Sequence, residues 1–130
     1  MVCLETSFLV NYLRGDEKAR LILQEFEKNG EILTIASPSI IELISGAELE
    51  EIKKEKEEII KLLSSLIILP LDKESAILAG EIEASLISSG QVIGIADIMI
   101  AAIAKRNGER LITRNVKHFE RIQGLEVEGY

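Results

Sequence analysis

Three acidic residues from distant parts of the chain stand in apolar surroundings. Glu5 directly follows a short apolar segment, Glu42 interrupts the apolar stretch 40–44, and Asp97 is the only charged residue between positions 95 and 104. An ionised carboxylate is costly to bury unless it is paired, hydrogen-bonded or bound to a metal ion, so each of these acids needs a partner. A carboxylate cluster without Cys or His ligands favours a hard cation such as Mg²⁺ or Mn²⁺. If the fold brings the acids together, we expect a site for such an ion.

Phosphodiester hydrolysis is the chemistry that suits such a cluster. A divalent cation there would polarise the phosphoryl group and stabilise charge on the leaving oxygen. The net charge of −7 argues against a nucleic-acid partner, because basic side chains drive phosphate binding. Many of the acidic residues, however, lie in segment 48–58, whereas the C-terminal third is locally basic. We expect its cations either to hold flanking phosphates or to form an ordinary solvated surface; they are Lys105, Arg106, Arg110, Arg114, Lys117 and Arg121.

Each acid also has a plainer structural explanation, which the sequence leaves open. Asp97 would lie in the first turn of a helix, where the helix dipole and free backbone N–H groups favour a carboxylate. Glu42 could face solvent from its helix. Glu5 could end a strand and cap the helix that follows. The joint occurrence of the three is stronger evidence for a site than any one of them.

Other catalytic chemistries find little support. The single histidine, His118, adjoins Phe119, and a surface or packing role is favoured over catalysis. The lone cysteine, Cys3, lies in an apolar segment and fits a core position better than a catalytic thiol. No motif indicates a zinc, dinucleotide, P-loop or serine-hydrolase site. Aromatic residues make up 4%, which argues against binding of single strands by base stacking alone.

Short apolar segments alternate with helical patterns along the 130 residues. This alternation predicts one domain spanning 1–130, an α/β/α sandwich with a mostly parallel four- or five-stranded sheet, whose sites lie beyond the carboxyl ends of the strands. No apolar run is long enough to cross a bilayer, so we expect no membrane partner and a cytoplasmic location. The predicted strands are 2–4, 32–36, 66–69, 110–113 and, less clearly, 125–128. The predicted helices are a short one after the N-cap residues Thr6 and Ser7, one capped by Asp16, and 37–47, 49–64, 73–89 and 95–105.

Four segments together share the pattern of a known family. They are VCLETSFLVNYLRG, SPSIIELISGAEL, IGIADIMIAAIAKRNG and LITRNVKHFERIQGLEV. In this order and at this spacing they resemble the PIN domain family, particularly its VapC-type toxins, over essentially the whole chain. The resemblance implies a Mg²⁺- or Mn²⁺-dependent endoribonuclease that acts on single-stranded segments of structured RNA. It also implies a homodimer that a small antitoxin holds inactive.

The resemblance assigns roles to individual residues. Glu5 and Asp97 would be the principal metal ligands, and Glu42 would complete or orient the shell. Asn115 stands where many relatives carry a fourth acid, and it could still donate to a water or a phosphate. The nearby contacts to substrate would come from Thr6, Thr113, Arg114 and Lys117.

Glu5 departs from the family pattern, which usually has aspartate at this place. The extra methylene moves the carboxylate by about one carbon–carbon bond, and a misplacement of about 1 Å can cost about a hundredfold in rate. We therefore expect attenuated activity. A degenerate PIN domain that binds RNA or a protein without cleaving is the alternative. A receiver-like regulatory domain is a third possibility, and it would make Asp72 a phosphorylation site.

Overall fold

The fold was obtained as a computed structural model that describes residues 1–51 and 53–130. Its centre is a five-stranded sheet in the order β3-β2-β1-β4-β5, in which every neighbouring pair is parallel. All five predicted strands are present, most of them shortened by a residue or two at the ends. Their bounds are β1 Val2–Leu4, β2 Leu33–Ala36, β3 Ile67–Leu69, β4 Arg110–Ile112 and β5 Val127–Glu128.

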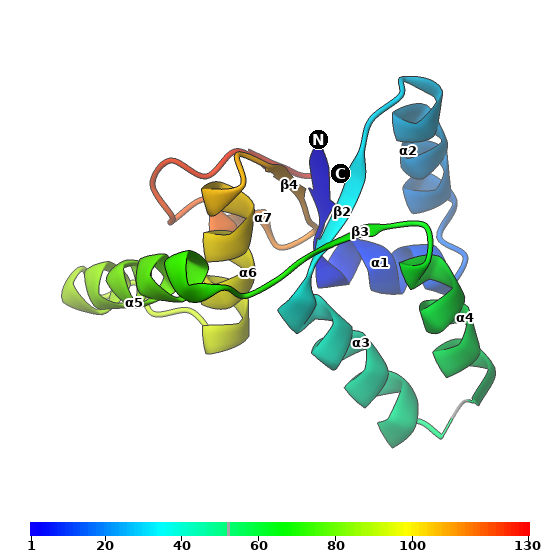
Figure 1. The fold of residues 1–130 in the computed structure, drawn as a ribbon, viewed down its shortest axis with the longest axis horizontal. Helices are drawn as coiled ribbons and strands as arrows, with labels where there is room; N and C mark the ends of the chain where they lie inside the picture. Colours follow the sequence, from blue (N-terminus) through cyan, green and yellow to red (C-terminus); the bar gives the residue numbers. More distant parts are fainter. Residues whose placement is uncertain (52) are drawn as a thin grey trace.

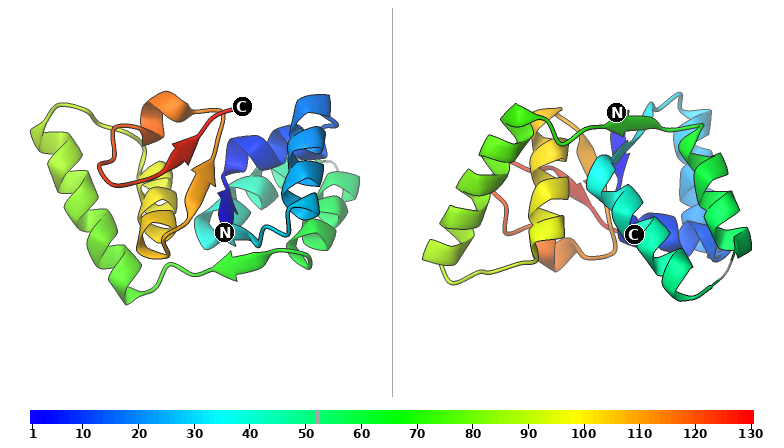
Figure 2. Two further views of the ribbon diagram at one scale, coloured as in Figure 1. Left: turned by 90° about the horizontal axis from the view of Figure 1, so that it is seen from above. Right: turned by 60° about the horizontal axis from the view of Figure 1, so that its bottom comes forward.

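Helices cover both faces of this sheet, as Figures 1 and 2 show. Alternate side chains of β1 enter two separate apolar clusters: Val2 and Leu4 pack with one set of helices, and Cys3 packs with the other. The predicted α/β/α sandwich is confirmed. The first set comprises α1 (Thr6–Leu13), α2 (Glu17–Lys28), α3 (Ser37–Leu49) and α4 (Lys53–Leu63), and the second comprises α5 (Lys73–Ser88), α6 (Ile95–Arg106) and α7 (Val116–Phe119).

Helix boundaries follow local capping chemistry, with corrections to the sequence prediction. Asp16 caps α2 as expected, because its carboxylate accepts from the backbone N of Ala19 at 2.9 Å. The cap of α1 is Glu5, and Thr6 and Ser7 are already helical, so their prediction as N-cap residues is wrong. Helix α3 runs past the predicted end to Leu49, and position 52, inside the predicted helix 49–64, lies outside the described residues. The short α7 was not predicted.

The sheet order excludes the receiver-like alternative. In that fold β1 lies between β2 and β3, whereas here it lies between β2 and β4. Asp72 is an exposed N-cap of α5, and its carboxylate accepts from the backbone N of Ser75 at 2.9 Å. That hydrogen bond lowers the pKa of Asp72. Its role here is helix capping.

Two further observations concern burial and the membrane. Cys3 is fully buried, and burial raises the pKa of its thiol to about 12, so the core role predicted for it is confirmed. Among residues 1–51 and 53–130, no helix is both long and apolar enough to cross a membrane.

Candidate active site

The carboxyl ends of the central strands bring the candidate residues to one edge of the sheet. Leu4 of β1 pairs in register with Ile112 of β4, so the residues that follow, Glu5 and Thr113, are neighbours. The strand β2 passes directly into α3, which carries Glu42. Asp97 lies in the first turn of α6, which packs against α3. Parallel strands end on the same side, and this is why acids from distant parts of the sequence converge.

Glu5 is almost fully buried and is held by a dense set of donors. Its Oε2 accepts from the backbone N of Ser7 at 3.0 Å, and its Oε1 accepts from the Ser7 hydroxyl at 2.6 Å. Thr113 donates its hydroxyl to the same Oε1. A carboxylate oxygen accepts about two hydrogen bonds, so Oε1 is saturated while Oε2 keeps one acceptor position. The alternative that Glu5 caps α1 is thus confirmed.

Ser7 is the site residue that sequence reasoning missed. Besides its two bonds to Glu5, its hydroxyl accepts from the backbone N of Arg114 at 3.0 Å and lies 3.3 Å from the Thr113 hydroxyl. It therefore joins the end of β1 to the end of β4. The signal was present in the sequence: an N-cap carboxylate takes the N–H of the residue two positions later, which here is Ser7.

Glu42 faces solvent on α3 but lies close enough to the other acids to feel their charge. Thr6 donates its hydroxyl to Glu42 Oε1 at 2.7 Å. Partial desolvation raises the pKa of Glu42; the Thr6 hydrogen bond lowers it, and the charges of Glu5 and Asp97 raise it further. Glu5, Glu42 and Asp97 therefore form one electrostatically coupled cluster. Glu42 is exposed, as the alternative explanation anticipated.

The raised pKa of Glu42 gives a prediction for stability. A carboxyl whose pKa rises on folding is favoured protonated, so its charge costs stability at neutral pH, and this cost disappears as the pH falls below the ordinary value of 4.5. Glu42→Gln keeps the acceptor for Thr6 and should raise the melting temperature by a few degrees near neutral pH, with no gain below about pH 4. Thermal denaturation at both pH values, with Glu57→Gln on α4 as control, measures this. A lower melting temperature at neutral pH would contradict the coupling.

Asp97 presents its carboxylate to the cluster and to a histidine. One oxygen, Oδ2, lies 3.2 Å from Nδ1 of His118 on α7, and the Asp97 side chain is 20% exposed. The helix start itself has no side-chain cap, since Gly94 occupies the N-cap position. The first-turn location proposed as the plainer explanation is confirmed, and it coexists with the approach to Glu42.

The remaining predicted residues lie in the segment that follows β4. Asn115 begins α7 and is exposed, and its backbone N donates to the Thr113 hydroxyl at 2.9 Å. Thr113 is fully buried, so its hydroxyl supports Glu5 and does not face solvent. Arg114 is exposed and lies over the ring of Tyr130 at 5.1 Å, and Lys117 is exposed on α7.

The basic rim is smaller than the sequence suggested. Arg110 precedes the carboxyl end of β4 and pairs with Glu31 at 3.1 Å and Glu128 at 3.0 Å. Lys105 donates to the backbone carbonyl of Gln123 at 2.7 Å. Arg110 is the first residue of β4 and pairs in register with Val2, so it lies at the opposite end of the strands from Glu5, and the expectation that it holds phosphates beside the acids is wrong. Arg114 and Lys117 keep positions next to the end of β4.

The donor set fits a hard divalent cation. All its candidate ligands are carboxylate oxygens, which Mg²⁺ and Mn²⁺ prefer. Within the described part of the chain, no three His, Cys, Asp or Glu side chains lie close enough together to hold a metal ion between them. An open cluster suits Mg²⁺, which keeps several waters and usually takes one or two carboxylates. The site is therefore suitable for a hydrated ion and would not fully enclose one.

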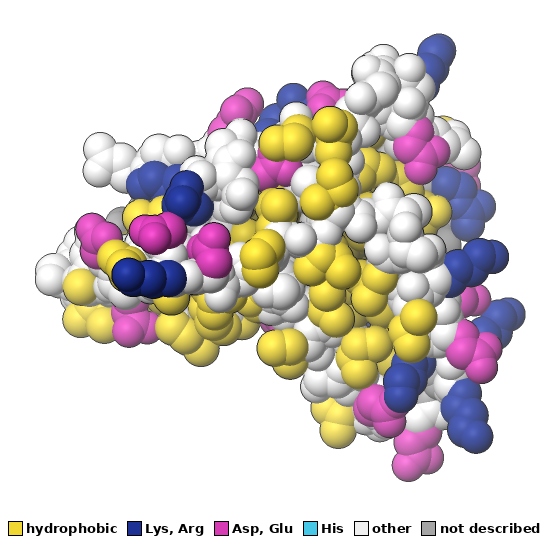
Figure 3. Space-filling model, viewed as in Figure 1, with side chains coloured by type: hydrophobic (Ala, Val, Ile, Leu, Met, Phe, Trp, Pro, Cys, Tyr) yellow, Lys and Arg dark blue, Asp and Glu magenta, His cyan; other side chains and the backbone are white. Residues whose placement is uncertain are grey.

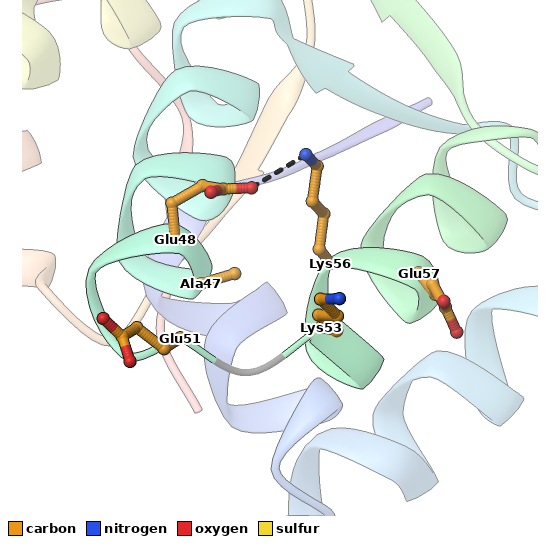
Figure 4. A pocket seen from close by; sticks show the side chains of 6 residues that line it. All are labelled: Ala47, Glu48, Glu51, Lys53, Lys56 and Glu57. Carbon is orange, nitrogen blue, oxygen red and sulfur yellow. Dashed lines mark ion pairs between the residues drawn. The ribbon is translucent and has the colours of Figure 1, made fainter.

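Two other features lie away from this cluster. A hollow of about 720 Å³ between α3 and α4 has a mixed-charge lining that includes the Glu48–Lys56 ion pair at 2.7 Å, shown in Figure 4. Glu109, just before β4, is buried and accepts from the Thr34 hydroxyl at 2.7 Å. It lies at the opposite end of the strands from Glu5 and so takes no part in the cluster.

Comparison with known proteins decides the family. A family model described as PIN domain matches residues 2–125. The chain belongs to the PIN domain family. Ribonuclease VapC2 of Haemophilus influenzae is 36% identical over 110 residues, which cover 84% of this chain and 83% of that protein. The tRNA(fMet)-specific endonuclease VapC of Salmonella typhimurium is 33% identical over 114 residues, covering 87% and 86% respectively.

Solved structures of PIN domain relatives agree with this assignment. VapBC2 from Rickettsia felis, crystallised with a DNA fragment from its promoter, superposes with a TM-score of 0.90 at 27% identity, covering 100% of this chain and 99% of the matched chain. A DNA-bound VapBC from Salmonella typhimurium superposes with a TM-score of 0.81 at 30% identity, covering 99% and 98%. The predicted VapC-type PIN domain is confirmed, with its PIN-like sandwich.

Proposed function

We propose that this PIN domain is a Mg²⁺- or Mn²⁺-dependent endoribonuclease and the toxin of a toxin–antitoxin pair. Ribonuclease activity and the toxin role are supported by VapC relatives at 36% and 33% identity. The observation that supports metal dependence is the placement of Glu5 and Asp97 at the carboxyl ends of the parallel strands, with Glu42 hydrogen-bonded to Thr6, the residue that follows Glu5. Three carboxylates near one another repel, and a divalent cation removes that repulsion.

The residues of the chain would divide the work as follows. Asp97 and Glu42 would hold the ion, and Glu5 would add its charge and its unsaturated Oε2. The ion itself would supply Lewis-acid polarisation of the scissile phosphate and stabilisation of the leaving oxygen. Arg114 and Lys117 would bind flanking phosphates, and Asn115 would donate its amide to a water or a phosphate.

The direct test of metal dependence is RNA cleavage by the pure protein. With Mn²⁺ we expect cleavage, with EDTA its loss, and with Mn²⁺ in excess over EDTA its recovery. Structured RNA with single-stranded loops is the substrate class, and tRNA is the first to try because one relative is named a tRNA(fMet)-specific endonuclease. Cleavage that persists unchanged in EDTA would contradict the proposal.

A second candidate function is binding without cleavage. It is favoured by one observation: the Glu5 carboxylate is almost fully buried among the hydroxyls of Ser7 and Thr113. The family resemblance leads us to expect the shorter aspartate at this position. If the cation binds weakly or not at all at this position, Arg114 and Lys117 would still be able to bind RNA. The substitution Glu5→Asp separates the two candidates, as argued in the Discussion.

The partners we propose are a small antitoxin and a second copy of the chain. Solved relatives are VapBC complexes, which pair a VapC chain with its antitoxin. Apolar side chains gather on the surface around β3 and α3 in Figure 3 and suit a homodimer interface. The exposed large apolar residues of these two elements are Ile41, Leu49, Ile67 and Ile68. Light scattering of the isolated chain should give twice its 14.4 kDa mass.

A further inference from the structure

We propose that His118 is a positioning residue that fixes the Asp97 carboxylate for divalent-cation binding through an Nδ1–H hydrogen bond. The proposal rests on the proposed function, because it assigns a role within the same site. Its starting point is the contact of 3.2 Å between His118 Nδ1 and Asp97 Oδ2. The imidazole and the carboxylate come from different helices, α7 and α6.

The chemistry of the contact fixes which group donates. An ionised carboxylate has only acceptor oxygens, so an attractive contact at this distance requires the proton on Nδ1. The neutral Nδ1–H tautomer and the imidazolium both satisfy this requirement. Positioning by His118 is therefore independent of whether the ring is charged.

The backbone that carries His118 is anchored on both sides. The next residue, Phe119, is fully buried in the cluster that also contains Ile98 of α6. The backbone N of His118 donates to the carbonyl of Asn115 at 3.1 Å, and the N of Ile122 donates to that of Phe119, also at 3.1 Å. Because Phe119 is buried and the backbone is hydrogen-bonded on both sides, the Cα of His118 has a defined position from which its side chain reaches Asp97.

The consequence for Asp97 is a carboxylate restrained at one oxygen and open at the other. Oδ2 is engaged by His118, and no hydrogen bond from the described residues reaches Oδ1. Ligating carboxylates in metal sites are usually hydrogen-bonded by outer groups, and loss of such a group typically costs about 10–100-fold in metal affinity. His118 is the side chain that supplies this bond to Asp97.

An ordinary surface ion pair is the competing explanation, because the His118 side chain is 51% exposed. Exposed pairs contribute little to stability. Positioning and a surface pair therefore differ in their readouts. A surface pair would leave cation affinity unchanged when removed, whereas positioning requires a loss of affinity with little change in melting temperature.

The experiment measures Mn²⁺ affinity by titration calorimetry, without RNA, for three substitutions of the histidine. The amide nitrogen of Asn occupies the place of Nδ1 and that of Gln the place of Nε2, so His118→Asn keeps the donor and His118→Gln moves it. We expect His118→Ala and His118→Gln to bind Mn²⁺ about 10–100-fold more weakly, and His118→Asn to stay close to the wild type. Glu120→Gln, an exposed change on the same segment, is the matched control.

The outcomes separate this proposal from the proposed function. If the wild type binds Mn²⁺ and all His118 variants bind equally well, positioning by His118 is overturned and the metal site stands. If Ala, Asn and Gln weaken binding equally and lower the melting temperature together, His118 acts by packing and the proposal is also overturned. If the wild type and Asp97→Asn show the same negligible Mn²⁺ binding, the metal site itself fails.

Discussion

Asp97→Asn should abolish nearly all Mn²⁺-dependent RNA cleavage while leaving the fold intact. The substitution keeps the shape of the side chain and removes its negative charge, so the ion loses a principal ligand. Loss of several kcal/mol of charge stabilisation corresponds to a rate lower by about a thousandfold. Initial cleavage rates of the wild type and of Asp97→Asn, on one RNA substrate at a fixed Mn²⁺ concentration, measure this loss.

The control for this prediction is a second helix-start aspartate. Asp97 lies in the first turn of α6, where a negative charge stabilises a helix by about 0.3–1 kcal/mol. Asp72 caps α5 and is exposed, so Asp72→Asn tests the cost of losing an acid at a helix start away from the cluster. Both variants should melt within a few degrees of the wild type, and Asp72→Asn should cleave normally. Equal activity of Asp97→Asn and wild type would remove Asp97 from the site.

Glu5→Asp should raise cleavage by up to about a hundredfold. The carboxylate of Glu5 stands one methylene further from the end of β1 than that of the family's usual aspartate, and a displacement near 1 Å can cost about that factor. Aspartate is a strong N-cap, so it can keep the hydrogen bond from the backbone N of Ser7 that begins α1. Single-turnover cleavage rates of the two proteins, each saturated with Mn²⁺, give the comparison.

Glu5→Gln is the matched control, because it keeps the length of the side chain and removes the charge. It should cleave more slowly than the wild type, whereas Glu5→Asp cleaves faster. An increase on Glu5→Asp identifies a weakened enzyme. Absence of cleavage in both Glu5→Asp and the wild type, with Mn²⁺ bound to each, would favour a module that binds RNA without cleaving it.

The general fold was predictable because it depends on local signals that tertiary contacts do not override. Short apolar segments separated by helical patterns specify a parallel sheet covered on both faces, and the cap at Asp16 follows from residue type. The short α7 was not predictable in this way. Its four residues have no amphipathic period, and it is anchored through the burial of Phe119 in a core assembled from distant segments.

The acids of the site were also identifiable from sequence, whereas their partners from distant parts of the chain were not. Glu5, Glu42 and Asp97 stand out because charge is costly in apolar surroundings. The bond of Glu5 with Ser7 is local and follows from the N-cap position, whereas its bond with Thr113 depends on the register of β1 with β4, which spacing alone does not determine. The contact of His118 with Asp97 likewise joins two helices whose packing is set by the core. The ion pairs of Arg110 with Glu31 and Glu128 also join segments that are distant in sequence.

Anomalous diffraction from crystals grown with Mn²⁺ tests the central claim most directly, because it locates the ion independently of any activity. A site built from the carboxylates at the ends of β1, α3 and α6 predicts an anomalous peak within about 2–2.5 Å of an Asp97 oxygen, with Glu42 and Glu5 around it. A well-occupied Mn²⁺ peak elsewhere, with none beside Asp97, would contradict it.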